Sequence, residues 1–378
     1  MAGLPANFWG AMDREIVRLA AEPGPAMIDV SKGNPDLPTP EHIVAAMQAA
    51  VADPRNHGYP SYAPRPALRR AVALRYREDH GVDLDPDTEV AVAHGSHEAI
   101  LGAVMAFADP GTAVVAPDPG YPLYTSAAHL AGAHVVPLPL APPAYQPDLT
   151  ATLPAAASVV LLNYPHNPTG ALATAQTFAD AADYATRAGA VIVHDFAYAS
   201  LGFDGRRPLS ALAVPAAREC TIEAQTLSKT YSMAGWRIGF AAGRAELVSA
   251  VSRYQAHAFS TVAGATQDAA AAALSGDQTA ARDLVALYQR RRDVVVAGLR
   301  RAGWDVTVPE GSFFVWARVP GDVDASETAR RLREEARVAV APGDGFGPGG
   351  RGHIRIGLVR DERVLAELVE RLVAFTRH

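Results

Sequence analysis

Short apolar runs recur along the chain from about residue 89, and Ala-rich amphipathic stretches or loops separate them. Several runs are apolar at consecutive positions, which is typical of strands covered by helices on both faces of a mostly parallel sheet. The alternation predicts an α/β domain of three layers, with a sheet between two layers of helices. The runs are EVAVAHG, TAVVAPDP, AHVVPLPL, SVVLLNYP, AVIVHD, TIEAQTLS and RIGFAAG.

The pattern changes at about residue 280, where a long helical stretch begins. Short strand-like runs follow it and an amphipathic stretch ends the chain, so a smaller α+β domain is expected here. The segment before residue 45 is expected to cross the surface and join that domain. We predict an N-terminal arm with part of the small domain at 1–44, a large domain at 45–280 and a small C-terminal domain at 281–378.

Composition and charge narrow the class of partner. Of the 378 residues 49% are apolar, which suffices for a sizeable core divided between a large and a smaller domain. The chain carries 34 basic and 40 acidic residues and a formal charge of -6, which argues against a nucleic-acid partner. We expect small-molecule substrates.

Cysteine content and apolar run length bear on location. Cys220 is the only cysteine, so one chain can build neither a disulfide nor a thiolate metal site, and a reducing, cytoplasmic location is expected. The N-terminal residues lack the basic start and continuous apolar core of a signal peptide. No apolar stretch reaches the roughly 20 residues that span a bilayer, so no membrane association is expected.

Two partial motifs lack a feature that their usual function requires. GFGPGG at residues 345–350 has the spacing G-x-G-x-x-G, but the strand-like HIRIGL follows where a dinucleotide site needs a helix. His97 and Glu98 begin the zinc motif H-E-x-x-H, yet Leu101 occupies the position of the second histidine. We therefore expect neither a dinucleotide loop nor a metal site.

Lys229 is the strongest candidate for chemistry. The only lysines are Lys32 and Lys229, and Lys229 lies between an apolar strand-like run and a glycine-containing turn. A desolvated lysine loses its proton readily enough to attack an aldehyde. A surface lysine that lies beside a strand is the structural alternative.

The residues around Lys229 favour the chemical interpretation. The run LSKTYSMAGWRIG from Leu227 to Gly239 resembles the lysine signature of fold-type I pyridoxal-phosphate-dependent aminotransferases, classes I and II. Thr226 replaces the usual Gly or Ser before this run but keeps a hydroxyl. HDFAYASLGFDG and YQRRRDVVVAGLRRAGW are similar to segments of bacterial alanine and LL-diaminopimelate-type enzymes, and the resemblance covers nearly the whole chain. It implies that pyridoxal 5'-phosphate forms a Schiff base with Lys229.

The resemblance also implies residues that hold the cofactor ring. Asp195 ends a strand-like run and corresponds to the carboxylate that pairs with the pyridine nitrogen, where it favours the protonated, electron-accepting ring. Tyr198 and Asn167 match the residues that bond the phenolic oxygen, and Tyr121 matches the aromatic residue stacked on the ring. As isolated residues, Asp195 could be a helix cap and Tyr121 a core residue.

Phosphate binding is expected at the start of the helix that follows EVAVAHG. Gly95 permits close approach of the backbone, and the amides of Ser96 and His97 can point at an anion. The structural alternative is an ordinary capped helix. By resemblance, Arg237 binds the phosphate, and hydroxyls from the lysine segment add hydrogen bonds. The residues with these hydroxyls are Thr226 and Ser228.

Substrate binding is expected to join both domains. Arg355 in HIRIGLV corresponds to the arginine that clamps the substrate carboxylate, a contact that a planar guanidinium makes with two parallel hydrogen bonds. Gly33 and Asn34 match the family loop that passes over the substrate, and Asn167 is expected to touch the carboxylate as well.

A homodimer with shared active sites is also implied. Tyr59 aligns with the tyrosine that reaches the phosphate of the neighbouring subunit. Pro64 stands where the family has Gly five residues later, and Tyr62 lies nearby, so either tyrosine could make the contact.

The reaction implied is transfer of an amino group between an L-amino acid and a 2-oxo acid by a ping-pong mechanism. Alanine or glutamate-type donors and an unusual 2-oxo acid of secondary metabolism both fit the signature. The alternative is a C–S or β-lyase of the same fold, because it uses the same lysine, aspartate and arginine. No residue in the sequence identifies the substrate side chain.

Overall fold

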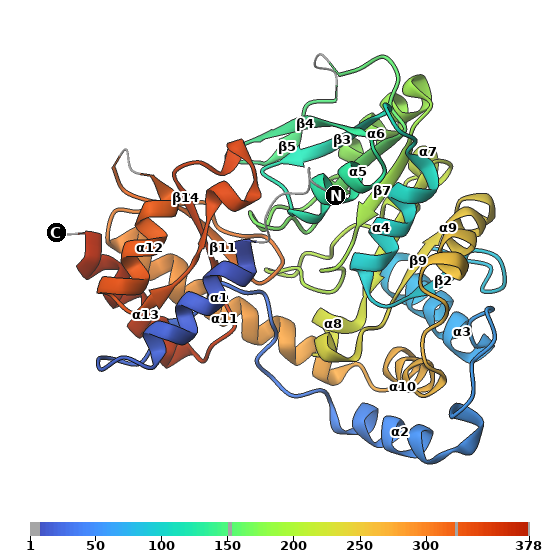
Figure 1. Ribbon diagram of the computed structural model, residues 1–378, viewed down its shortest axis with the longest axis horizontal. Helices are drawn as coiled ribbons and strands as arrows, with labels where there is room; N and C mark the ends of the chain where they lie inside the picture. The colour runs from blue at the N-terminus through green and yellow to red at the C-terminus, as the bar shows by residue number, and fades with distance from the viewer. Residues whose placement is uncertain (1–7, 150–152, 322–323, 377–378) are drawn as a thin grey trace.

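The computed structural model describes residues 8–149, 153–321 and 324–376, and a mixed eight-stranded sheet lies at the centre of its larger part (Figure 1). The strand order is β2-β9-β8-β7-β6-β3-β4-β5. Neighbours from β8 to β4 run parallel, whereas β9 and β5 run antiparallel to the strands beside them. The strands are β2 (Val90–Ala93), β3 (Ala113–Asp118), β4 (His134–Ala141), β5 (Gln146–Pro147), β6 (Val159–Asn163), β7 (Val191–Asp195), β8 (Thr221–Thr226) and β9 (Gly239–Gly243).

Helices cover both faces of this sheet because its central strands are apolar on both. In β6, Val159 and Leu161 enter one hydrophobic cluster, while Val160 and Leu162 enter another on the opposite face. The first cluster includes residues of α4, α5 and α9, and the second includes residues of α6 and α7. These helices are α4 (Ser96–Phe107), α5 (Leu123–Leu130), α6 (Ala175–Ala188), α7 (Pro215–Arg218) and α9 (Ala245–Ala258).

A third cluster covers the β2–β9 end of the sheet. Ile43, Leu68 and Leu274 pack there against Val90 and Phe240. They come from α2 (Glu41–Ala52), α3 (Pro66–Arg75) and α10 (Gly264–Ser275). The three-layer α/β/α architecture with a mostly parallel sheet, predicted from the apolar runs, is confirmed.

The smaller part of the molecule has an antiparallel sheet of order β10-β11-β14-β13, with three helices packed against it (Figure 1). It confirms the predicted additional α+β domain. Residues 343–350 form two short 3-10 turns, and the strand β14 follows them, as the strand-like run HIRIGL predicts. The elements are α11 (Thr279–Arg301), β10 (Asp305–Val306), β11 (Phe314–Arg318), α12 (Ala325–Glu335), β13 (Ala341–Pro342), β14 (His353–Gly357) and α13 (Glu362–Thr376).

The N-terminal segment packs on this smaller part. Strand β1 (Ile28–Asp29) pairs in parallel with β12 (Val338–Ala339). In α1 (Phe8–Ala20), Glu15 accepts a hydrogen bond of 2.6 Å from Arg333 of α12. Residues 1–7 of the predicted arm lie outside the described residues, and the domain boundaries near 44 and 280 stay predictions.

The sheet places several polar residues at one edge. Asn163, Asp195 and Thr226 end the neighbouring strands β6, β7 and β8, and α8 (Leu227–Thr230) follows β8 directly. Ligands of open α/β sheets bind at the carboxyl ends of such strands. Within the described ranges, no helix is both long and apolar enough to cross a membrane.

Candidate active site

A cavity of about 320 Å³ lies at the carboxyl edge of the large sheet and is also lined by residues of the N-terminal segment and the smaller sheet. It contains most of the residues that the sequence predicted to bind cofactor or substrate. These are Gly33, Ser96, His97, Tyr121, Asn167, Asp195, Tyr198, Thr226, Ser228, Lys229, Arg237 and Arg355.

Lys229 points into this cavity from α8. Its Nζ donates a hydrogen bond of 2.7 Å to the carbonyl oxygen of Gly33 and lies 5.5 Å from the centre of the Phe313 ring. Burial, together with the positive charges of Arg355 and Arg237, lowers the pKa of the lysine to about 8, against an opposing effect of Asp195. The amine therefore loses its proton much more easily than a lysine in water.

Asp195 is buried, with 6% of its surface exposed, and no ion pair fixes its carboxylate among the described residues. The hydroxyl of Tyr124 donates to Oδ2 at 2.8 Å, and the amide of Ala197 donates to Oδ1 at 3.2 Å. Burial raises the pKa of Asp195, and the Tyr124 hydrogen bond opposes that rise. A cationic ring nitrogen would supply the partner that this carboxylate lacks.

The start of α4 and Arg237 form a cradle for an anion. Gly95, which precedes the helix, has φ +94°, and a Cβ there would lie 2.8 Å from Nη2 of Arg237. No side chain caps the first turn of the helix within the described residues, so its amides are available to a ligand. Arg237 is held by hydrogen bonds to the carbonyls of Ala234 at 2.8 Å and His94 at 3.0 Å.

The hydroxyls of the lysine segment lie beside this cradle. Oγ1 of Thr226 is 2.8 Å from Oγ of Ser228 and 3.2 Å from the carbonyl oxygen of Ile238. Thr226 replaces the usual Gly or Ser at this position, and its hydroxyl orients the side chain of Ser228.

Arg355 lies across the cavity on β14 and is almost fully buried, with 2% exposed. Nη1 donates to Oδ1 of Asn167 at 2.8 Å, Nη2 donates to the carbonyl of Ser31 at 2.7 Å, and Nε has no partner among the described residues. The guanidinium lies 4.0 Å from the centre of the Phe314 ring. Burial lowers its pKa to about 10, so it stays charged at neutral pH and lacks only an anionic partner.

Aromatic and amide groups complete the walls. Tyr198 makes an edge contact of 5.3 Å with Phe313, and Tyr121 lies 6.4 Å from the His97 ring. The backbone N–H of Asn167 donates to Oδ1 of Asn163 at 2.8 Å, so β6 fixes the loop that carries Asn167.

Four of the predicted residues lie outside the cavity lining. Gly95 contacts Arg237 behind it, and Asn34 is exposed to solvent. Tyr59 is 99% exposed and Tyr62 is 70% exposed, so neither joins the site within one chain. Their proposed contact with a neighbouring subunit stays a prediction.

Sequence reasoning missed several residues of the site. Trp9, Lys32, Ile100 and Phe314 line the cavity, and Tyr124 lies beneath it against Asp195. Tyr124 occurs three positions after Tyr121 at the start of a buried helix, but only the fold shows which of the two aromatic residues meets Asp195.

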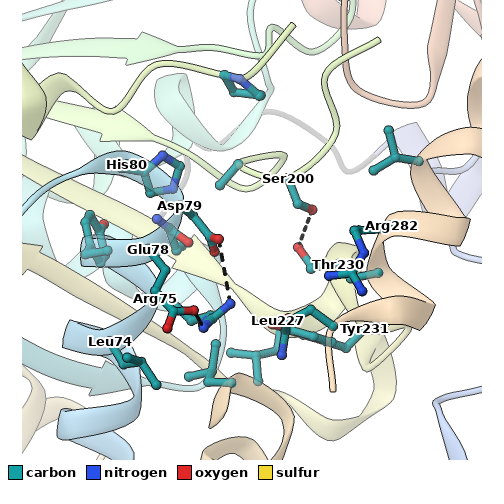
Figure 2. A pocket seen from close by; sticks show the side chains of 18 of the residues that line it. Leu74, Arg75, Glu78, Asp79, His80, Ser200, Leu227, Thr230, Tyr231 and Arg282 are labelled. Atoms are coloured by element: carbon teal, nitrogen blue, oxygen red, sulfur yellow. Dashed lines mark hydrogen bonds and ion pairs between the residues drawn. The ribbon is translucent and has the colours of Figure 1, made fainter. Parts of the chain in front are cut away.

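A larger cavity of about 670 Å³ lies on the other side of the lysine segment (Figure 2). Charged side chains of η2 (Tyr76–His80) line it. Arg75, the last residue of α3, pairs with Glu78 of η2 and lies 3.6 Å from Asp79. The hydroxyls of Ser200 and Thr230 are 2.8 Å apart at its wall. We assign the chemistry to the smaller cavity, which contains the lysine, the buried aspartate and the arginine.

The smaller cavity suits pyridoxal phosphate in three respects. The uncapped helix start beside Arg237 fits a phosphate, the buried Asp195 fits a protonated ring nitrogen, and the amine of Lys229 fits an aldehyde. Arg355 then remains for a carboxylate of the substrate.

Comparisons with known proteins agree with this geometry. A model of the family described as aminotransferase class I and II matches residues 25–372. The L-glutamine–4-(methylsulfanyl)-2-oxobutanoate aminotransferase of Bacillus subtilis is 45% identical over 98% of this chain and 94% of its own length. The LL-diaminopimelate aminotransferase of Desulforudis audaxviator is 44% identical over 98% of this chain and 95% of its own.

Solved structures are similar over the whole chain. Substrate-bound BacF from Bacillus subtilis matches with a TM-score of 0.95 at 36% identity, covering 99% of this chain and 96% of that one. The N-succinyldiaminopimelate aminotransferase of Mycobacterium tuberculosis matches with a TM-score of 0.92 at 30% identity, covering 98% and 97%. The chain belongs to the class I and II aminotransferases, and it is a pyridoxal-phosphate-dependent transaminase of fold type I that moves an amino group between amino acids and oxo acids.

Proposed function

We propose that Lys229 bonds the cofactor aldehyde and then acts as the base that moves the substrate proton. The observation that carries this proposal is the meeting of Lys229, Asp195 and Arg355 in one buried cavity, each without an ion-pair partner among the described residues. The lowered pKa of the lysine leaves a substantial neutral fraction of the amine near pH 8. A neutral amine is required both for attack on an aldehyde and for proton abstraction.

The substrate is oriented by the arginine. Arg355 binds the α-carboxylate through its guanidinium, and the Phe314 ring and the Asn167 side chain fix the plane of that group. Bound pyridoxal phosphate supplies an electron-accepting ring, which Asp195 keeps protonated. Lys229, once the substrate amine has taken its place, would be the base that accepts the proton from the substrate Cα and later gives that proton up.

The substrate class is proposed from the relatives together with the cavity. The curated names give glutamine, 4-(methylsulfanyl)-2-oxobutanoate and LL-diaminopimelate, all with unbranched side chains. We propose an unbranched amino acid and 2-oxo acid for this chain too. Trp9 and Lys32 line the cavity outside the proposed cofactor contacts, which supports them as candidates for contact with the substrate side chain.

We further propose a cytoplasmic homodimer in which Tyr59 or Tyr62 reaches the phosphate of the neighbouring subunit. The nearly complete exposure of Tyr59 in a single chain supports this assignment, because a large aromatic side chain in water has no packing partner. The same exposure supports Tyr62 less strongly.

A panel of amino acids tests the reaction. The purified enzyme with bound cofactor is mixed with one amino acid at a time, including alanine, glutamate, glutamine, methionine and LL-diaminopimelate. We expect an unbranched member to bleach the absorbance of the bound aldehyde and to yield one 2-oxo acid per site. Formation of pyruvate and ammonia without a second oxo acid would instead indicate a lyase, and failure of every amino acid would refute transamination.

A further inference from the structure

A buried histidine and glutamate lie directly behind the cofactor site. His194 in β7 and Glu223 in β8 are register partners on adjacent parallel strands, and both side chains are fully inaccessible to solvent. Nδ1 of His194 lies 2.8 Å from Oε1 of Glu223. Two ionisable groups in an otherwise apolar sheet are costly unless they are paired, so their protonation states are constrained.

The ring of His194 has a hydrogen-bond acceptor at each nitrogen. Nε2 lies 3.0 Å from the carbonyl oxygen of Tyr164, which can only accept, so Nε2 carries a proton. Nδ1 faces the carboxyl group of Glu223. The state of the pair therefore depends on whether the proton between Nδ1 and Oε1 belongs to the histidine or to the glutamate.

The surroundings of Glu223 place that proton on the histidine. Besides His194, the carboxyl group receives hydrogen bonds from the amide of Ala211 at 2.6 Å, the hydroxyl of Ser210 at 2.8 Å and the hydroxyl of Tyr76 at 3.0 Å. A carboxylate that accepts several hydrogen bonds is stabilised in its charged form. Burial alone would raise the pKa of Glu223, but the hydrogen bond and charge of His194, together with the charge of His80 and the hydrogen bond from Ser210, lower it.

Other titratable groups near the pair do not replace this charge. Tyr76 donates to Glu223, and burial and the negative charge of Glu223 raise the pKa of its hydroxyl. His80, at the wall of the larger cavity, lies 5.1 Å from the ring of Phe196, and burial lowers its pKa (Figure 2). The charges of Glu223 and Asp79 oppose this lowering of the His80 pKa, whereas those of His194 and Arg207 add to it. The two acceptors that face its ring therefore favour His194 as the cation that pairs with Glu223.

Asp195 follows His194 in the chain and depends on nearby positive charge. Successive strand residues point to opposite faces, so the imidazole lies on the other side of β7 from the Asp195 carboxylate. Lys229 is the other cation close to Asp195, but it must be neutral when it acts as a nucleophile or base. His194 takes no part in the proposed proton transfer, so its charge persists through the reaction.

We propose that His194 is a positioning residue, held as an imidazolium by Glu223, and that the charge of His194 keeps Asp195 ionised for the ring nitrogen of the cofactor. The proposal rests on the proposed contact between Asp195 and the ring nitrogen. The ring stack of His194 on Phe196, with centres 4.8 Å apart, fixes the imidazole in place.

Nitrogen NMR of the apo protein, selectively labelled at histidine, tests the ion pair without any contribution from activity. The His194 resonance is assigned by its loss in His194→Gln. We expect protons on both ring nitrogens at neutral pH, because each nitrogen faces an acceptor. A neutral ring with a bare Nδ1 would overturn the proposal.

The coupling to Asp195 is tested with matched variants of the holoenzyme. Glu223→Gln should let His194 lose its proton, shift the pH profile of the bound-cofactor absorbance and lower kcat roughly tenfold with little change in KM. Glu223→Asp, which keeps the charge, should recover most of kcat. Ser210→Ala removes one hydrogen bond to Glu223 but no charge, so it should leave His194 protonated and the pH profile in place.

The possible failures can be distinguished. If Ser210→Ala and Glu223→Gln change the pH profile alike, or if Glu223→Gln changes neither the profile nor kcat, the proposed role of His194 is wrong. Those results leave the transaminase chemistry untouched. Retained multiple turnover in Lys229→Ala would instead overturn the proposed function.

Discussion

Arg355 and Lys229 are two cations in one buried cavity, and what separates their functions is the set of atoms around each. The guanidinium of Arg355 stacks on Phe314 and is oriented by hydrogen bonds from both sides, which suits a fixed clamp. Among the described residues, the amine of Lys229 has a single hydrogen bond, to a carbonyl oxygen, which leaves it free to move. The resemblance could predict both residues, but the environment that makes one a clamp and the other a nucleophile appears only in the fold.

Arg355→Lys should weaken substrate binding. A lysine keeps the charge but loses the planar pair of donors and the stacking on Phe314, which removes about 1.5 to 3 kcal/mol of charged hydrogen bonding. We expect kcat/KM for the amino acid to fall roughly 10- to 100-fold in steady-state assays. Arg318→Lys, an exposed change on the neighbouring strand, is the control and should have no effect. Equal losses in the two variants would refute the clamp.

The lowered pKa of Lys229 predicts a pH dependence of cofactor attachment. Below about pH 8 the amine is mostly protonated and cannot attack the aldehyde, so the rate of covalent attachment to the apo protein should rise through pH 8 and level off above it. Arg355→Met removes one of the charges that disfavour the ammonium form and should move the midpoint upward. Stopped-flow absorbance measures both, and a midpoint near the ordinary lysine value of about 10.4 would contradict the environment described for Lys229.

At the scale of elements, the apolar runs predicted the strands well because helices bury both faces of the sheet. Every run singled out in the large domain contains a strand of that sheet. The ionisable residues inside these apolar runs pair with each other in the fold, but the sequence alone does not show the pairing. His194 and Glu223 interrupt two of these runs, but their register pairing depends on which strands become neighbours, and that is a property of the folded sheet.

The start of α4 gives an element-scale prediction. Gly95→Ala would place a Cβ 2.8 Å from Nη2 of Arg237, at a φ that side chains rarely adopt, so Arg237 must shift and the phosphate cradle opens. We expect the affinity for pyridoxal phosphate to fall at least roughly tenfold in an equilibrium titration of the apo protein. Gly111→Ala is the control for backbone strain without a steric clash, because φ there is +81° and no atom lies within 4 Å of the added Cβ. That control should lose stability but keep its cofactor affinity.

At the scale of the whole molecule, the cavity joins segments that are far apart in the chain. Gly33 comes from the N-terminal segment, Lys229 from α8 at the edge of the large sheet and Arg355 from the smaller sheet, so the site exists only when these parts are packed together. Their order along the chain could be matched to a family. The residues at the mouth, such as Trp9 of α1, could not be foreseen, because no local pattern shows where an amphipathic helix will dock.

Shared active sites predict complementation between subunits. Lys229→Ala and Tyr59→Ala each damage a different part of a site, and in a mixed dimer one site would contain both native residues. Mixing the two variants under conditions that exchange subunits should give more activity than the sum of the separate proteins. No gain after mass measurement has verified mixed dimers would exclude Tyr59 as the shared residue, and the same test with Tyr62→Ala would then decide for or against Tyr62.

Attachment of the cofactor at Lys229 is the claim on which the rest depends, and the chain offers an internal control because Lys32 is its only other lysine. Borohydride reduction of the protein loaded with pyridoxal phosphate, followed by proteolysis and mass spectrometry, locates the bond. We predict that the added mass is found on the peptide that contains Lys229 and is absent from the peptide that contains Lys32. Stoichiometric label on Lys32, or no label on Lys229 in an active preparation, would contradict the assignment.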